Sequence, residues 1–256
     1  MPSLSPQALQ IINNYLTLPF PNKHISCPYF NNRRIKLRGG LRVVVGKGTP
    51  QDIVEETNIL SLREKINLNN LTDVELKKFL IDYHLGIDCS GLVYHILDTE
   101  MKAQNKGSLQ KVLKRPWFKN PLRKLLVKLR PIENTGVGTF NHEVNSTEIN
   151  LKDARPGDFI ILMGAGIKQD YNHILLIHET EHHQDNLKPE NYKLKAISYI
   201  HSFQYPTDGQ YNHGVRQENI EITDINKPLL EQNWSEPQMK DYAKTAKEMK
   251  IKRLKI

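Results

Sequence analysis

Apolar residues recur at helical spacing in the first part of the chain and form short strand-like runs further on. Residues 5–16 carry apolar side chains three or four positions apart, which predicts a short helix ended by Pro19 and Pro21. Arg42–Val45 is rich in β-branched residues and is flanked by glycines, so we expect a strand there.

Residues 49–84 are expected to be mainly helical. Thr49 followed by Pro50 fits a helix start, with an N-cap threonine and proline at the first helical position. Thr72 and Glu75 have the spacing of a capping box, in which each side chain satisfies a backbone amide of the other residue.

The second half of the chain reads as strands. Three short apolar runs, at 159–163, 174–177 and 194–200, are separated by turn residues and predict antiparallel strands. Residues 239–256 have apolar side chains on one side of a helical projection, which predicts a terminal amphipathic helix. Helices first and strands later indicate an α+β fold with helices packed on an antiparallel sheet.

Chain length and net charge leave the expected fold class unchanged and add two local features. A chain of 256 residues suggests one enlarged domain, or one domain with a sizeable insertion. The formal charge of +8 favours an anionic partner without naming it, whether nucleic acid, lipid or wall polymer. Residues 101–132 contain ten lysines and arginines and no acid, and a second basic run closes the chain at 240–255.

The basic segment 102–130 is also amphipathic, with prolines at 116 and 121. Such a segment can attach to an anionic membrane or wall-polymer surface, form an ordinary helical hairpin with a solvated basic face, or act as a lid beside a cleft. We expect no specific nucleic-acid partner.

Cys89 has the sequence context of a nucleophile. It stands at the expected start of a helix that continues through the apolar positions of 92–97. Helix amides and the helix dipole favour a thiolate there and can bind an oxyanion. The alternative is a small buried cysteine without chemistry.

Three segments resemble, in order, the signature of the NlpC-type cell-wall cysteine peptidases. They are Asp88-Cys89-Ser90-Gly91-Leu92-Val93, Ala154-Arg155-Pro156-Gly157-Asp158-Phe159 and Asn172-His173-Ile174-Leu175-Leu176-Ile177. The resemblance implies a papain-like α+β fold, with helices on a central antiparallel sheet. It also implies a hydrolase that cleaves an amide bond of a bacterial peptidoglycan stem peptide without a cofactor.

The same resemblance implies a role for individual residues. Cys89 is the nucleophile, His173 the general base, and His201 the best match to the group that orients the base. This assignment agrees with chemistry, because a thiol needs a nearby base and the base needs an orienting partner. For substrate binding the resemblance implies Asp88 and Ser90, together with Tyr29 of the Pro28-Tyr29 pair, recognising a free amine or another polar end.

The chain departs from the family pattern by its insertions. We expect an N-terminal helical segment at 1–24 and a catalytic domain at 25–225, interrupted at about 46–85 and 102–150. A basic helical tail follows at 226–256. The long link between Tyr29 and Cys89 replaces a short glycine-rich connection, so Tyr29 is equally well a core aromatic.

Two rival motifs carry other chemistry. His178-Glu179-Thr180-Glu181-His182 matches the H-E-x-x-H zinc pattern, but that chemistry needs a helix and a third ligand. The surrounding residues favour a strand followed by a hairpin loop, so we expect no metal. Val45–Thr49 fails the phosphate-loop pattern, because Gly48 stands where a serine or threonine is required.

These observations leave a leading hypothesis, a cysteine hydrolase, and two alternatives: a non-catalytic wall- or membrane-binding module on the same fold, and a zinc hydrolase. The two cysteines, Cys27 and Cys89, are too few for a disulfide framework. No charged n-region precedes an apolar segment, so we expect cytoplasmic synthesis, with a leaderless route or release on lysis for a wall-cutting enzyme.

Overall fold

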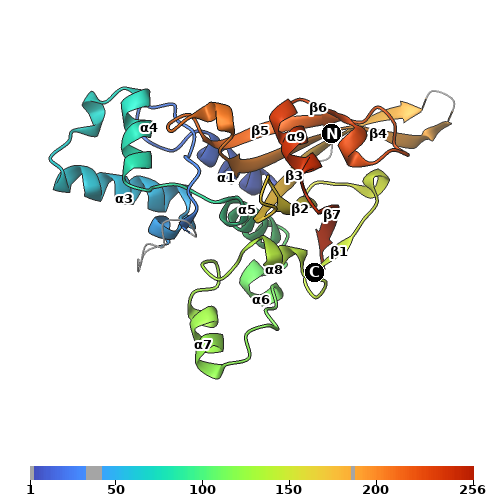
Figure 1. Ribbon diagram of the computed structural model, residues 1–256, viewed down its shortest axis with the longest axis horizontal. Helices are drawn as coiled ribbons and strands as arrows, with labels where there is room; N and C mark the ends of the chain where they lie inside the picture. The colour runs from blue at the N-terminus through green and yellow to red at the C-terminus, as the bar shows by residue number, and fades with distance from the viewer. Residues whose placement is uncertain (1–2, 33–41, 186–187) are drawn as a thin grey trace.

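The strands join in one curled antiparallel sheet in the computed structural model, which describes residues 3–32, 42–185 and 188–256 (Figure 1). Seven strands lie in the order β1-β7-β2-β3-β4-β5-β6. They are β1 (Ser146–Glu148), β2 (Phe159–Ala165), β3 (Tyr171–Asp185), β4 (Lys188–Phe203), β5 (Gly214–Glu221), β6 (Asn233–Trp234) and β7 (Glu248–Leu254). The expected α+β class is confirmed, while residues 33–41 of the expected catalytic domain lie outside the described part of the chain.

The α-helices precede the sheet, apart from the last one. They are α1 (Pro6–Leu16), α3 (Pro50–Arg63), α4 (Asp73–Asp82), α5 (Cys89–Ala103), α6 (Leu109–Val112), α7 (Pro121–Leu129), α8 (Val137–Asn141) and α9 (Pro237–Lys244). The capping predictions are confirmed, since Thr49 accepts the backbone N–H of Asp52 and Thr72 forms a capping box with Glu75. The short 3-10 helices are η1 (Val43–Val45), η2 (Leu68–Asn70), η3 (Leu151–Asp153), η4 (Pro206–Asp208) and η5 (Leu229–Glu231).

The central strands are buried on both faces. Along β2, Phe159 and Ile161 belong to a hydrophobic cluster with α1, α3, α4 and α5, whereas Ile160 and Leu162 face a second cluster that includes α9. All four side chains are fully buried. This two-sided burial explains why the strands appear in the sequence as continuous apolar runs rather than alternating ones.

The predicted strand at Arg42–Val45 was wrong. Val43–Val45 forms the 3-10 turn η1, which ends at Gly46 in the left-handed region with φ +73°. A Cβ at Gly46 would lie 2.5 Å from the carbonyl oxygen of Phe30, so the chain packs too closely there for any other residue. Tertiary packing overrides the β-propensity of the valines.

The helix predicted over 239–256 was wrong in its second half. α9 ends at Lys244, and β7 inserts into the sheet between β1 and β2. Arg253 of β7 makes a two-pronged ion pair with the buried Asp158, at 2.7 and 2.8 Å. The segment is a strand despite its amphipathic pattern, because hydrogen bonds to β1 and β2 and this ion pair stabilise the extended conformation.

The H-E-x-x-H segment lies within strand β3 rather than in the expected hairpin loop. His178 is 3% exposed, and its Nε2 has no hydrogen-bond partner among the described residues. No group of three or more histidine, cysteine, aspartate or glutamate side chains in the described ranges has an arrangement that could hold a metal ion. The strand conformation removes the helical face that a zinc site of this type requires.

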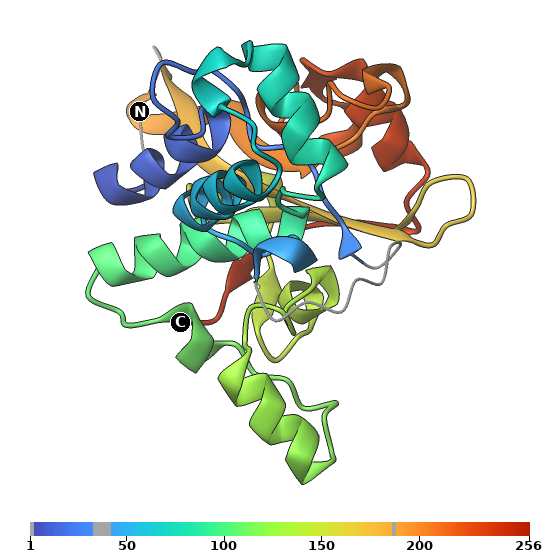
Figure 2. The same ribbon diagram turned by 90° about the vertical axis from the view of Figure 1, so that its left-hand side faces the viewer.

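Helix α7 projects away from the body of the molecule in both views (Figures 1 and 2). Val127 is its buried residue, and the leucines of the helix are exposed. No helix among residues 3–32, 42–185 and 188–256 is long and apolar enough to cross a membrane.

Buried His178 makes stability depend on pH. Burial lowers the pKa of His178 to about 4, whereas an unfolded histidine has a pKa near 6.5. The unfolded chain therefore binds the proton first, and the free energy of unfolding falls by about 3 kcal/mol as the pH drops from 6.5 to 4. We expect His178→Leu to remove this part of the loss in denaturant titrations across that range. The same change at half-buried His182 is the control, and an unaltered pH slope in His178→Leu would contradict the prediction.

Candidate active site

Cys89 is the first residue of α5, as the sequence predicts. Asp88 caps the helix, because its Oδ1 accepts the backbone N–H of Gly91 at 2.6 Å. A Cβ at Gly91 would lie 2.9 Å from the carbonyl oxygen of Gly46. The glycine two residues after Cys89 thus allows the preceding loop to close over the first turn of the helix, where the amides have no intrahelical partner.

Helix α5 brings Cys89 against β3, the strand that carries His173. The helix packs on β3 and β4, and the Cys89 side chain is 7% exposed. The backbone N–H of Ile174, the residue after His173, lies near enough to the Cys89 sulfur to lower the pKa of the thiol. Asn172, the residue before His173, lines the same pocket as Cys89. Two of the three predicted motifs therefore meet in the fold.

His173 and His201 are paired across neighbouring strands. Nε2 of His173 lies 3.0 Å from Nδ1 of His201, and both side chains are buried. The carboxylate of Glu218, on β5, lies 3.6 Å from Nε2 of His201. The three side chains form a row that crosses β3, β4 and β5.

Glu218 fixes which ring nitrogens carry the protons. Its carboxylate accepts hydrogen bonds from the hydroxyl groups of Tyr199, at 2.6 Å, and Tyr205, at 3.2 Å. A carboxylate beside Nε2 of His201 favours a proton on that nitrogen, which leaves Nδ1 as an acceptor. His173 then donates through Nε2, and its own Nδ1 keeps the lone pair that a general base needs.

The thiol of Cys89 is protonated at neutral pH. Burial and then the charge of Asp88 raise the pKa of Cys89 to about 12. Lys47 and the amides of Ile174 and Ser90 lower this pKa, but burial outweighs them. The amide at the helix start thus acts in the expected direction, and burial decides the net direction of the shift in the free protein.

His173 is neutral at the same pH. Burial lowers the pKa of His173 well below its usual range, and the neighbouring His201 lowers it further. Burial also lowers the pKa of His201, although Glu218 acts in the opposite direction. The site in its free state combines a thiol with an uncharged imidazole, not a thiolate with an imidazolium.

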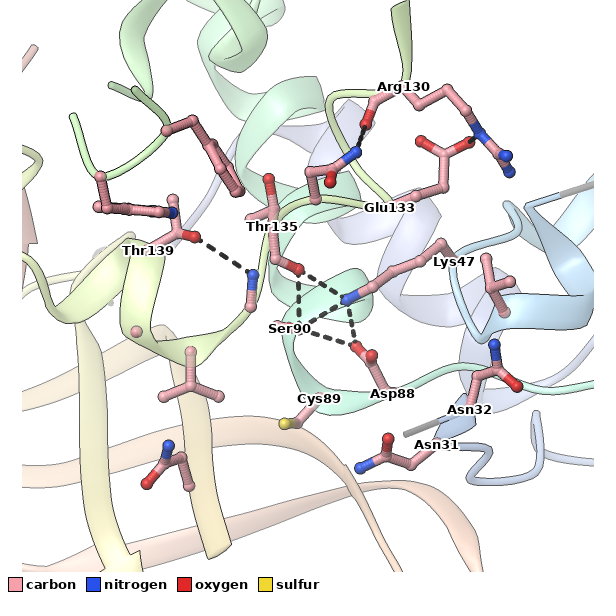
Figure 3. Close-up of a pocket in the computed structure, with 18 of the residues that line it drawn as sticks. Asn31, Asn32, Lys47, Asp88, Cys89, Ser90, Arg130, Glu133, Thr135 and Thr139 are labelled. Atoms are coloured by element: carbon pink, nitrogen blue, oxygen red, sulfur yellow. Dashed lines mark hydrogen bonds and ion pairs between the residues drawn. The ribbon is translucent and has the colours of Figure 1, made fainter. Parts of the chain in front are cut away.

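Lys47 is buried at the start of α5 and is 5% exposed (Figure 3). Its Nζ donates to Asp88 Oδ1 at 2.7 Å, to Ser90 Oγ at 2.6 Å and to the carbonyl oxygen of Thr135 at 2.9 Å. Ser90 donates its hydroxyl to Asp88 Oδ1 at 2.9 Å. Asp88 and Ser90, the predicted substrate-binding residues, are thus already bonded to a lysine of the chain.

A pocket of about 1280 Å³ opens beside Cys89. Its wall combines the loop before α3, the start of α5, and the long insertion that contains α7 and α8. Its lining includes Asn31, Lys47, Asp88, Cys89, Arg123 and Glu133. This volume is large enough for an extended peptide segment.

Tyr29 lies next to the pocket rather than in its wall. Its backbone bridges to Ile87, directly before Asp88. Its hydroxyl accepts the side-chain amide of Asn31 at 3.1 Å, and its backbone N–H donates to Nδ1 of His213 at 3.1 Å. The structure brings Tyr29 close to the loop that precedes Cys89, and its contact with substrate stays a prediction.

Sequence reasoning missed Lys47 and Glu218. Lys47 lies in the segment 45–49, which does not fit the phosphate-loop pattern. The signal for its role in the sequence is a lysine between two glycines that follow three valines. Glu218 stands opposite Tyr199 across the β4–β5 ladder, a pairing that depends on strand register. Neither position can be assigned without knowing which segments meet.

Comparison of the chain with models of known protein families, with curated proteins and with solved structures found no match.

The charge of Asp88 gives a direct test of the thiol environment. Because Asp88 raises the pKa of Cys89, we expect Asp88→Asn to lower it and to speed iodoacetamide labelling at neutral pH by about threefold or more. Asparagine keeps a side-chain oxygen that can cap α5 and accept from Lys47, and an unchanged far-UV circular dichroism spectrum is required of the variant because Lys47 loses its charged partner. Peptide mass spectrometry follows Cys89, with fully buried Cys27 as an internal reference and Asp98→Asn as the control variant. Equal or slower labelling in Asp88→Asn would show that the carboxylate does not act on the sulfur.

Proposed function

We propose that this chain is an NlpC-type, papain-like cysteine hydrolase that cleaves an amide bond of a peptidoglycan stem peptide. One observation carries the proposal: Cys89, at the amino end of α5, packs against the strand that contains His173. The imidazole of His173 contacts that of His201, and the far side of His201 faces Glu218. The three sequence motifs in family order support the choice of family.

The reaction begins from the neutral pair. His173 Nδ1 takes the proton of the Cys89 thiol as the sulfur attacks the carbonyl carbon of the scissile amide. The tetrahedral intermediate collapses when His173 returns this proton to the leaving amine, and the C–N bond breaks. Water then hydrolyses the thioester with His173 again as base, which releases the acid and restores the thiol.

Neighbouring groups stabilise the charges that form. The backbone N–H of Cys89, at the helix start, donates to the oxyanion. His201 holds the tautomer of His173, and Glu218 stabilises the positive charge that the histidine pair acquires during proton transfer. Asp88, Ser90 and Tyr29 bind polar groups of the substrate.

Cys89→Ala and His173→Ala test the assignment. We expect both to keep the fold and to lower turnover of stem peptides from digested peptidoglycan by at least about a hundredfold, since each removes a reacting group. Cys27→Ala, which removes the other buried thiol, is the matched control and keeps turnover. Product formation is measured by chromatography and mass spectrometry. A residual rate within about tenfold of wild type in Cys89→Ala would refute the nucleophile.

We propose as a second function that α7 attaches the protein to an anionic lipid surface. Four leucines at helical spacing form an exposed stripe: Leu122 72%, Leu125 54%, Leu126 50% and Leu129 67%. Arg123, Lys124 and Lys128 accompany the stripe on the same helix. Exposed leucines among cations, in a segment of the chain without acids, have the chemistry of an interfacial helix.

Vesicle binding tests this surface. We expect cosedimentation with vesicles containing phosphatidylglycerol, weaker binding to pure phosphatidylcholine, and loss of binding at high salt. Leu122→Ser with Leu129→Ser should weaken binding by about tenfold or more, because two leucines no longer enter the interface. Ile59→Ser with Leu62→Ser, on exposed positions of α3, is the matched control. Binding to insoluble wall polymer but not to vesicles would overturn the lipid assignment.

A further inference from the structure

The ammonium of Lys47 has no free donor. An ammonium group carries three N–H bonds, and those of Lys47 are directed to Asp88, Ser90 and the carbonyl of Thr135, all within 2.9 Å. The stem of the lysine packs over the first turn of α5, where a Cβ at Gly91 would lie 3.0 Å from its Cδ. Lys47 is therefore built into the site and is not a mobile surface cation.

One oxygen of the Asp88 carboxylate, Oδ1, is correspondingly occupied. Asp88 Oδ1 receives Lys47, the hydroxyl of Ser90 and the N–H of Gly91. The negative charge of Asp88 is balanced by an ammonium 2.7 Å away. A substrate ammonium placed here would share the single carboxylate of Asp88 with Lys47, so two positive charges at short range would have one negative charge between them.

Among the described residues of the pocket wall, the other carboxylate is that of Glu133, which two arginines, Arg130 and Arg42, already neutralise. Besides Lys47 and Asp88, its Lys, Arg, Asp and Glu side chains are Arg123, Arg130 and Glu133. Glu133 lies 3.2 Å from Arg130 in an ion pair. Arg123 bonds the neutral side chain of Asn134 and stacks over Phe118. The described wall thus carries three cations and two carboxylates, an excess of one positive charge.

We infer that the ammonium group of Lys47 occupies the place in which Asp88 and Ser90 would otherwise bind the amino group of a substrate. The pocket then accepts peptides in which the amino group that lies next to Asp88 is acylated. This inference rests on the proposed hydrolase function. An amide N–H donates to the exposed part of Asp88, whose side chain is 15% accessible, without bringing a second positive charge. The substrate class is then a stem peptide still joined through its amino end, rather than one with a free terminus.

A matched peptide pair tests the inference on the wild-type protein. The two peptides have the same sequence, and one has a free α-amine where the other is N-acetylated. We expect kcat/KM to favour the acetylated peptide by about tenfold or more, because the free amine meets Lys47. A preference of the wild-type protein for the free amine would overturn the inference and leave the hydrolase assignment intact.

Lys47→Ala then vacates the ammonium position. We expect the ratio of kcat/KM values, acetylated over free, to fall by about tenfold or more, since the free amine can now bind Asp88 and Ser90. An unchanged ratio would contradict the inference. If this variant does not fold, the wild-type comparison still decides.

A binding test that does not use turnover separates the two proposals. The n-propylammonium ion replaces the atoms that Lys47→Ala removes, so we expect it to raise the melting temperature of this variant above that in equal sodium chloride. Wild type and Lys152→Ala, which removes an exposed lysine, should show no such rise. Stabilisation without cleavage of either peptide would support the internal ammonium and refute the hydrolase, whereas no stabilisation would refute the internal ammonium.

Discussion

The burial of the Lys47 ammonium holds together the parts of the chain that form the site. One atom, Nζ, joins the loop before α3, the cap of α5 at Asp88 and the carbonyl of Thr135 in the long insertion. Arg115 extends the connection, because it donates to the Thr135 hydroxyl at 2.5 Å. Removing one partner of such a cluster leaves an uncompensated buried charge, so these three segments depend on one another for their positions.

The sheet provides the second constraint on the site. Because β2 and β3 are buried on both faces, their register cannot slip without moving apolar side chains out of two hydrophobic clusters. Strand β7, from the last residues of the sequence, pairs with β2, and Arg253 of β7 forms an ion pair with Asp158. Strand β4, which pairs with β3, also contributes to both clusters, through Tyr199 and Ile200. The pairing of β3 with β4 is what brings His201 to 3.0 Å from His173.

Local signals in the sequence were sufficient for the helix starts at Thr49, Thr72 and Cys89, because a cap depends on residues within one turn. The apolar runs were sufficient for the central strands. Prediction failed where contacts between segments remote in the sequence determine the conformation. Residues 43–45 form a 3-10 turn because Gly46 packs on Phe30, and residues 248–254 form a strand because they pair with β2. Lys47 and Glu218 belong to this second group, since each acquires its role from segments remote in the sequence.

The reacting atoms assigned to the site are buried and uncharged in the free protein, which constrains the proposed thiol chemistry. Burial opposes a thiolate at Cys89 and a proton on His173 alike, so a preformed ion pair is the less stable arrangement. In the proposed reaction, proton transfer is then favoured only when the sulfur attacks and charge moves to an oxyanion held by helix amides. The carboxylate of Glu218 lies behind His201 as a fixed negative charge, and Lys47 balances the charge of Asp88 next to Cys89.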